Sequence, residues 1–120
     1  MQNRASLIEH LENEIERTKR TGEPLALAIC DIDYFKRVND TYGHPVGDRV
    51  LKEFAERMKE TFRPYDLISR NGGEEFVVCC TSLESEPNAI FERFREAIAS
   101  TPFLEKDLSL NVSVSVWIAT

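Results

Sequence analysis

The sequence has no excess of basic residues, few cysteines and no long hydrophobic run. Its 21 acidic residues outnumber 15 basic ones, which leaves a net charge of −6 over 120 residues. That balance argues against sequence-independent binding to duplex nucleic acid, because such binding needs clustered lysine and arginine. It leaves a nucleotide ligand open, since Mg²⁺ can supply the positive charge that phosphates require. The start of the chain is polar, and the sequence predicts neither a signal peptide nor a membrane segment.

Cysteine is scarce. Only Cys30, Cys79 and Cys80 are present, and all three lie in apolar runs. Their spacing fits neither a metal site nor a disulfide framework. Because Cys79 and Cys80 are adjacent, their side chains should point to opposite faces of a strand. We therefore expect buried, reduced thiols and a cytoplasmic location.

The length and composition predict one ordinary folded domain. A chain of 120 residues with 42% hydrophobic and 30% charged residues can bury a real core. We expect a single domain over residues 1–120, with an N-terminal helix at 1–21 and a core at 25–119. The abrupt start at a helix favours a domain of a longer protein.

Hydrophobic periodicity predicts four helices and four strands. In the first helix, Ile8, Leu11 and Ile15 form an apolar stripe with Leu7 beside it. The continuous apolar run at 25–30 is typical of a central strand covered on both faces. The predicted helices are 5–20, 34–41, about 46 to Pro64, and 89–99, and the predicted strands are 25–30, 67–70, 76–80 and 108–119.

The order of these elements predicts the fold class. Without the first helix and the short helix at 34–41, the chain reads βαββαβ, which is a ferredoxin-like α+β arrangement with an antiparallel sheet. Right-handed crossovers place the first and third strands side by side in the middle of that sheet. This topology brings Asp31, at the end of the first strand, next to Glu74 and Glu75, at the start of the third.

A glycine pair precedes these two glutamates. Gly72 and Gly73 predict a two-residue hairpin turn, because both central positions of a type I′ turn need positive φ. Glutamate is uncommon in strands, so Glu74 and Glu75 fit either a solvated hairpin tip or a site for a cation or a phosphate–metal complex. The convergence with Asp31 favours the second interpretation.

Two motifs resemble one known family. Residues 31–48, which read DIDYFKRVNDTYGHPVGD, and residues 72–76, which read GGEEF, resemble the GGDEF domains of bacterial diguanylate cyclases, in the variant with Glu in third place. The similarity runs from about Asn3 and Arg4 to Ala119. It implies the palm-like βαββαβ core that nucleotidyl cyclases and polymerases also use.

The resemblance implies a reaction and a metal. The reaction condenses two GTP into cyclic di-GMP and two pyrophosphates, with Mg²⁺, or Mn²⁺ in its place, as cofactor. Asp31, the backbone carbonyl of Ile32 and Glu74 would be the metal ligands. Glu74, or Glu75 beside it, would help to deprotonate the attacking 3′-hydroxyl. Because each domain would bind one GTP, a homodimer would be needed for catalysis.

The resemblance also implies a substrate-binding set. Asn39 and Asp48 would read guanine, because a carboxylate accepts hydrogen bonds from its N1–H and exocyclic amine while an amide offers both a donor and an acceptor. His44 would lie near the nucleotide, and Lys36 with the backbone at Phe35 would hold phosphates. The complete implied set is Phe35, Lys36, Asn39, His44, Asp48, Gly72 and Gly73.

Arg63 and Asp66 form an Arg-x-x-Asp pattern at a fixed offset before the glycine pair. The resemblance implies an inhibitory site where these two residues bind the product, cyclic di-GMP. The alternative is structural: an arginine at a helix C-terminus, favoured by the helix dipole, and an aspartate that opens a turn.

The sequence departs from the family pattern in three places. The signature that normally precedes Asn3 is absent, and the 120 residues do not include the family's final helix with a lysine and an arginine for the triphosphate. Trp117 stands where the family usually has glycine. Two hypotheses therefore remain: a cyclase domain regulated by a sensor domain, or a weak or inactive domain that binds GTP or cyclic di-GMP as a sensor or interaction module. The retained polar residues favour the first, namely Asp31, Asn39, Asp48, Glu74 and Glu75.

Overall fold

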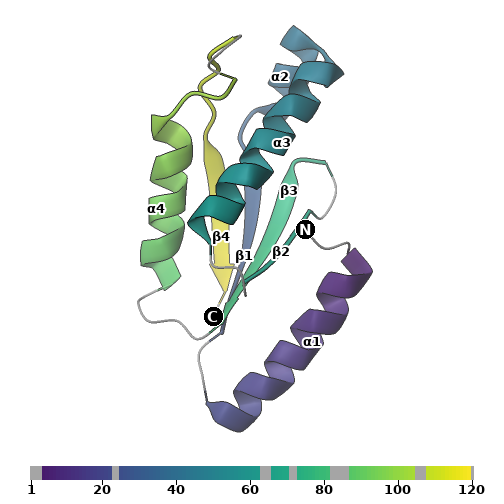
Figure 1. The fold of residues 1–120 in the computed structure, drawn as a ribbon, viewed down its shortest axis with the longest axis vertical. Coiled ribbons are helices and arrows are strands. Elements are labelled where there is room, and N and C mark those ends of the chain that lie inside the picture. The colour runs from purple at the N-terminus through teal and green to yellow at the C-terminus, as the bar shows by residue number, and fades with distance from the viewer. Residues whose placement is uncertain are drawn as a thin grey trace.

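The computed structural model describes residues 4–22, 25–62, 66–70, 73–81, 87–104 and 108–119. With α1 and α2 set aside, the elements follow the predicted βαββαβ order, so the expected α+β fold class is confirmed (Figure 1). The elements are α1 (Arg4–Thr21), β1 (Leu25–Ile32), α2 (Phe35–Tyr42), α3 (His44–Thr61), β2 (Leu67–Arg70), β3 (Glu75–Thr81), α4 (Pro87–Ser100) and β4 (Val114–Ala119).

The four strands form one antiparallel sheet in the order β2-β3-β1-β4. The first and third strands therefore lie in the middle, as predicted. β1 and β3 pair from Leu25↔Thr81 at one end to Asp31↔Glu75 at the other. The carboxyl end of β1 and the amino end of β3 thus share one edge of the sheet.

The main core lies between the sheet and the helices α3 and α4, which cover one of its faces (Figure 1). Alternate residues of β1 face this core, because side chains along a strand point to opposite faces in turn. The predicted inward positions of α3 are all buried: Val50, Leu51, Phe54 and Met58. Phe54 lies at the centre, with its ring 5.1 Å from that of Phe76 and 5.6 Å from that of Phe94.

Phe54→Ala is expected to lower the free energy of unfolding by about 3–5 kcal/mol, because the fully buried ring leaves a cavity among three other phenylalanines. Urea unfolding followed by circular dichroism measures this loss. Ile8→Ala is the control: its side chain is 48% exposed, so its effect should stay within about 0.5 kcal/mol. A loss below about 1 kcal/mol at Phe54 would contradict this description of the core.

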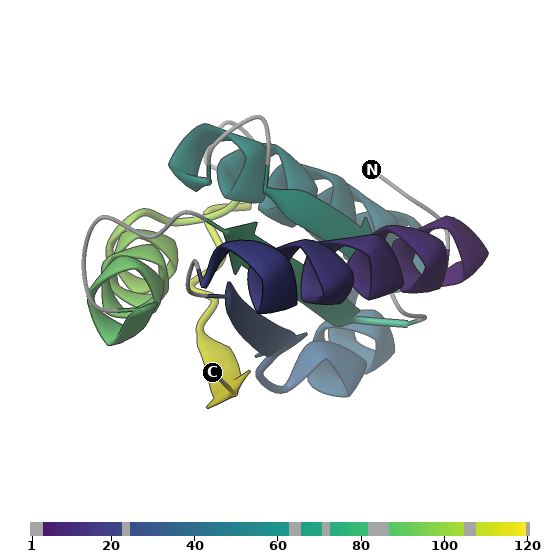
Figure 2. The same ribbon diagram turned by 90° about the horizontal axis from the view of Figure 1, so that it is seen from below.

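Helix α1 lies on the opposite face of the sheet, against β2 (Figure 2). Leu7 is buried there, as are Val77 and Cys79, and none of the three belongs to the main core. The predicted stripe is wrong in part, because Ile8 and Ile15 are 48% and 37% exposed. The helix contacts the sheet through its Leu7 side instead.

The expectation that both faces of β1 are covered is also wrong. Ile29 is 37% exposed and pairs across the strands with Trp117, which is 59% exposed. We call these two residues the Ile29–Trp117 pair. They lie on the face opposite α3 and α4, since their strand neighbours Ala28 and Cys30 belong to the main core.

Two element boundaries differ from the predictions. α3 begins at His44 rather than near Val46, because Pro45 is accepted in the first helical turn, where its missing N–H costs nothing. β4 begins at Val114 rather than Leu108. Val114 pairs with Ile32, the last residue of β1, and Leu110 instead pairs with Phe103.

The three cysteines are buried thiols outside any disulfide, as predicted. Burial raises the pKa of Cys30 to about 12, and burial followed by the negative charges of Glu14 and Asp66 raises that of Cys79 to about 11. Cys80 belongs to the main core and Cys79 does not, which confirms that they face opposite sides. Within the described ranges, no helix is both long and apolar enough to cross a membrane.

Candidate active site

The acidic residues predicted to converge do meet at one edge of the sheet. Asp31 pairs directly with Glu75, and the Ile32 N–H donates a hydrogen bond of 3.4 Å to the Glu74 backbone carbonyl. Because directly paired residues share a face, the Asp31 and Glu75 side chains lie on the same side of the sheet. Both lie on the face opposite α3 and α4, since Ile32 and Phe76 point into the main core.

The Asp31 carboxylate is electrostatically strained. Its Oδ1 atom is buried without a hydrogen-bond partner. Burial, and then the negative charges of Glu74, Glu75 and Asp33, raise the pKa of Asp31 above its usual range. A divalent cation would satisfy the buried oxygen and neutralise this repulsion, so the donor set fits a metal of the kind that oxygen ligands bind.

The described residues contain no group of three or more His, Cys, Asp or Glu side chains placed to hold a metal ion. Where a site supplies only one or two carboxylates, a hard cation such as Mg²⁺ takes the rest of its coordination from water and substrate phosphates.

The turn between β2 and β3 differs from the predicted two-residue hairpin. Arg70 pairs with Phe76, so five residues separate the last paired positions and the register centres on Gly73. A two-residue turn at 72–73 would pair Arg70 with Glu75 instead. Gly73 does have the expected positive φ, at 47°, and the Arg70 Nε donates a hydrogen bond of 2.8 Å to its carbonyl. Gly72 lies outside the described residues.

A glycine lets one of the two residues predicted to read guanine lie against the helix that carries the other. Asn39 lies on α2, and its side-chain oxygen lies against the Cα of Gly47 in α3, next to Asp48 along the chain. A Cβ at Gly47 would overlap that oxygen and would lie 3.2 Å from the Phe35 ring. Gly47 was not predicted as a site residue, and its only sequence signal is its place immediately before Asp48.

Asp48 lines a small pocket that reaches the β2–β3 hairpin. This pocket has a volume of about 250 Å³. It holds two cations that the sequence reasoning missed, Lys52 and Arg70. The signal for Arg70 was its position just before the Asn71-Gly72-Gly73 turn. The lining residues are Asp48, Leu51, Lys52, Ala55, Arg70 and Phe76.

The remaining predicted residues divide into buried and exposed ones. Phe35, the first residue of α2, is buried and packs on the core, whereas Lys36 and His44 are exposed. Neither Lys36 nor His44 lines the two described pockets. Asp66 is buried, and Arg63 lies outside the described residues, so the structure does not test the Arg63–Asp66 prediction.

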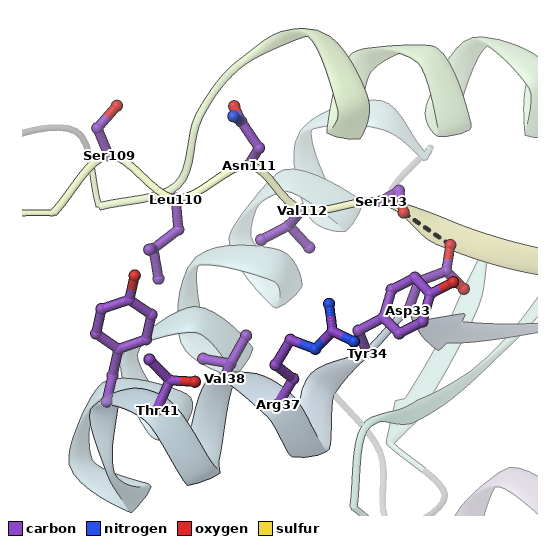
Figure 3. Close-up of a pocket in the computed structure, with 11 residues that line it drawn as sticks. Asp33, Tyr34, Arg37, Val38, Thr41, Ser109, Leu110, Asn111, Val112 and Ser113 are labelled. Carbon is purple, nitrogen blue, oxygen red and sulfur yellow. Dashed lines mark hydrogen bonds between the residues drawn. The ribbon is translucent and has the colours of Figure 1, made fainter.

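A larger pocket lies between α2 and residues 109–113 (Figure 3). Its volume is about 490 Å³, and none of the predicted site residues lines it. Tyr34 and Arg37 stand on its α2 side, with the Arg37 guanidinium 5.1 Å from the centre of the Tyr34 ring. Asp33 also lines it and contacts Ser113.

Metal-assisted phosphoryl transfer needs carboxylate oxygens close to the reacting phosphates, and this edge of the sheet offers paired carboxylates with backbone oxygens beside them. The sequence comparisons agree. The chain belongs to the GGDEF family: residues 1–120 match the family described as "Diguanylate cyclase, GGDEF domain". The resemblance inferred from the two motifs is therefore confirmed.

Individual relatives cover nearly all of this chain. It is 48% identical over 118 residues to diguanylate cyclase DgcP of Pseudomonas aeruginosa, covering 97% of this chain and 17% of DgcP. Among solved structures, the GGDEF domain of YfiN (or TpbB) from the same organism matches with a TM-score of 0.91 and 31% identity, covering 99% of this chain and 75% of that one. Diguanylate cyclase SiaD of P. aeruginosa, solved with its activator SiaC, matches with a TM-score of 0.87 and 40% identity over 97% of this chain and 45% of SiaD. The chain thus spans less than a fifth of DgcP and under half of the SiaD chain.

Proposed function

We propose that this domain is a diguanylate cyclase. In the proposed reaction, the 3′-hydroxyl of each of two GTP molecules attacks the α-phosphate of the other. Each attack breaks the bond between the α- and β-phosphates, so the products are cyclic di-GMP and two pyrophosphates. The observation that carries the proposal is the strained Asp31 carboxylate, with its buried unpartnered oxygen, beside Glu74 and Glu75 in a member of the GGDEF family.

Asp31, the Ile32 carbonyl and Glu74 would hold Mg²⁺ or Mn²⁺, which when bound supplies positive charge to the transferred phosphoryl group. Glu74, or Glu75 beside it, would take the proton of the attacking hydroxyl. Both carboxylates lie at the same sheet edge as Asp31, which would keep the proton acceptor close to a phosphate bound there.

The substrate would be oriented by α2 and the start of α3. Asn39 and Asp48 would hydrogen-bond to guanine, and the contact of the Asn39 side-chain oxygen with Gly47, the residue before Asp48, supports this role. The backbone at Phe35 with Lys36 would hold phosphates, and Gly72 and Gly73 would let phosphates approach the hairpin backbone. His44, which is exposed as the first residue of α3, would contact the nucleotide.

The reaction requires two domains, each with one GTP, so we propose that the protein works as a homodimer in the cytoplasm. Its activity would depend on a regulatory partner or a sensor domain. The SiaD structure, which contains an activator protein, supports control of this kind in the family.

An incubation of the purified protein with GTP and Mg²⁺ tests the proposal, with the products separated by chromatography. We expect cyclic di-GMP and pyrophosphate from the wild type and none from Glu75→Ala. GTP binding without any product, even at high protein concentration, would overturn the cyclase assignment. That outcome would instead support the alternative of a module that binds GTP or cyclic di-GMP.

Arg63→Ala is expected to weaken cyclic di-GMP binding about ten-fold or more, because an arginine–phosphate contact at the proposed inhibitory site is a charge-assisted hydrogen bond. Calorimetric titration of cyclic di-GMP into the two proteins measures the change. Lys59→Ala is the matched control, since it removes an exposed cation from the last turn of α3. Equal affinity for wild type and Arg63→Ala would remove Arg63 and Asp66 from the functional residues.

A further inference from the structure

The second aspartate of the Asp31-Ile32-Asp33 sequence has a different environment from the first. Both oxygens of the Asp33 carboxylate accept hydrogen bonds from serine hydroxyls: Ser113 Oγ donates to Oδ2 at 2.8 Å, and Ser115 Oγ donates to Oδ1 at 2.5 Å. The Asp33 N–H also donates to the Ser113 carbonyl at 3.0 Å. Figure 3 shows the Ser113 contact at the start of β4. Three hydrogen bonds therefore tie Asp33 to Ser113 and Ser115, and we call this group the Asp33–serine tie.

The tie lies next to a backbone conformation that needs support. Tyr34 has φ 57° and ψ 29°, the left-handed region, which costs a residue with a side chain about 1–2 kcal/mol. The Tyr34 carbonyl accepts hydrogen bonds from the N–H groups of Arg37 at 3.0 Å and Val38 at 3.3 Å. The turn is thus held from β4 on one side, through Asp33, and from α2 on the other. A strained backbone conformation of this kind is retained when several contacts of the surrounding structure hold it in place.

The turn joins two parts of the proposed active site. Ile32, whose carbonyl would bind the metal, precedes it, and Phe35 and Lys36, which would hold phosphates, follow it. A change in the Asp33–Tyr34 backbone would therefore alter the spacing between the metal and the phosphates. Because GTP would contact both parts at once, a displacement of about 1 Å between them would weaken its binding as well as its reaction.

We propose that Asp33 is a positioning residue, not a metal ligand, and that the Asp33–serine tie fixes the left-handed Tyr34 turn in the geometry that binds GTP. This inference rests on the proposed function. The two aspartates of the motif thus have different roles. Asp31 has an oxygen without a hydrogen-bond partner, which can bind a cation, whereas both oxygens of Asp33 accept hydrogen bonds from serine hydroxyls.

Kinetics of four variants separate positioning from metal binding. In Asp33→Ala and in the double variant Ser113→Ala/Ser115→Ala, we expect the KM for GTP to rise about ten-fold or more, while the Mg²⁺ concentration for half-maximal rate at saturating GTP changes less than about two-fold. Adding both serine changes to Asp33→Ala should cause little further loss, since the three residues act as one unit. Ser113→Thr/Ser115→Thr keeps the hydroxyls and should restore a KM near that of the wild type.

Asp33→Asn is a second variant in case Asp33→Ala fails to fold, because asparagine can still accept a hydrogen bond from one serine and donate one to the other. We expect its KM to lie between those of wild type and Asp33→Ala. A rise in the Mg²⁺ requirement in both Asp33 variants would show that Asp33 is a ligand and overturn the proposal. A lower kcat with unchanged KM, together with a lower melting temperature, would overturn it in favour of a purely structural role.

One measurement does not depend on the cyclase activity. Amide hydrogen exchange of Arg37 and Val38, followed by NMR in the protein without nucleotide, should become faster in Asp33→Ala and in the double alanine variant. Unchanged exchange at both amides would overturn the tie even if the protein makes no cyclic di-GMP. Faster exchange in a protein that does not turn over GTP would leave the tie standing and count against the proposed function alone.

Discussion

Asp31→Asn is expected to slow cyclic di-GMP synthesis severely and, at the same time, to raise the melting temperature of the metal-free protein. The pKa of Asp31 is raised in the folded state by burial and by Glu74, Glu75 and Asp33, so its ionised form destabilises the fold at neutral pH. An amide removes that charge but also removes the proposed metal ligand, for which we expect a rate loss of about 100-fold or more. Product chromatography and thermal melting with and without Mg²⁺ measure the two effects.

The change in melting temperature on adding Mg²⁺ is the more specific of the two measurements. A cation that binds only the folded protein raises its melting temperature, so Mg²⁺ should stabilise the wild type and not Asp31→Asn. Glu56→Gln is the matched control, because it neutralises an exposed carboxylate on α3 and should change neither quantity. A metal-free Asp31→Asn protein that melts below the wild type would contradict the strained-carboxylate description. Equal stabilisation of both proteins by Mg²⁺ would contradict the metal assignment.

Gly47→Ala is expected to weaken GTP binding about ten- to hundred-fold with little change in stability. The new methyl group would overlap the Asn39 side-chain oxygen, so the amide must rotate away and lose the hydrogen bonds proposed to form with guanine, each worth about 1–3 kcal/mol. Alanine also favours the helix by about 1 kcal/mol over glycine, which offsets the cost of moving Asn39. Titration with a non-hydrolysable GTP analogue measures the affinity, and thermal melting measures the stability.

A double-mutant cycle checks that Gly47 acts through Asn39. If it does, Gly47→Ala should add almost nothing to the loss already caused by Asn39→Ala. Additive losses would mean that Gly47 affects the nucleotide by another route. The ratio of GTP to ATP affinity adds a second readout, since a displaced Asn39 should weaken the preference for guanine over adenine.

Much of the fold could be predicted because its strongest signals are periodic. The apolar positions of α3 recur at helical spacing and the apolar run of β1 is continuous, so the sequence of each segment indicates its type of secondary structure. The order of the elements then predicts that β1 and β3 pair. The start of β4 could not be predicted this way. Residues 108–113 alternate like a strand, but a strand pairs only where a partner exists, and β1 ends at Ile32, opposite Val114.

The meeting of the acidic residues could also be predicted, because it depends on the order of the strands in the sheet more than on the conformation of the loops. Asp31 and Glu75 meet as soon as β1 and β3 are neighbours, whatever the loops do. The hairpin register could not: the glycine pair predicts positive φ, but the cross-strand pairing of Arg70 with Phe76 sets the turn length.

The supporting residues are those that sequence reasoning missed. Gly47, Ser113 and Ser115 act through contacts with residues at least eight positions away in the chain, and no local pattern marks a hydroxyl or a missing side chain as important. The covered face of α1 was misjudged for a related reason. A single stripe on a charged helix predicts amphipathicity, but which side of the stripe touches the sheet depends on how the helix crosses it.

The Ile29–Trp117 pair gives the protein a built-in optical reporter. Trp117 is the only tryptophan in the sequence, so intrinsic indole fluorescence comes from one known position. It lies on β4 directly across from Ile29, two residues before Asp31 in β1, and it is 59% exposed. Its emission should therefore be that of a hydrated indole in the isolated domain. A blue shift would signal that a partner or another segment of polypeptide has covered this face, without any label attached to the protein.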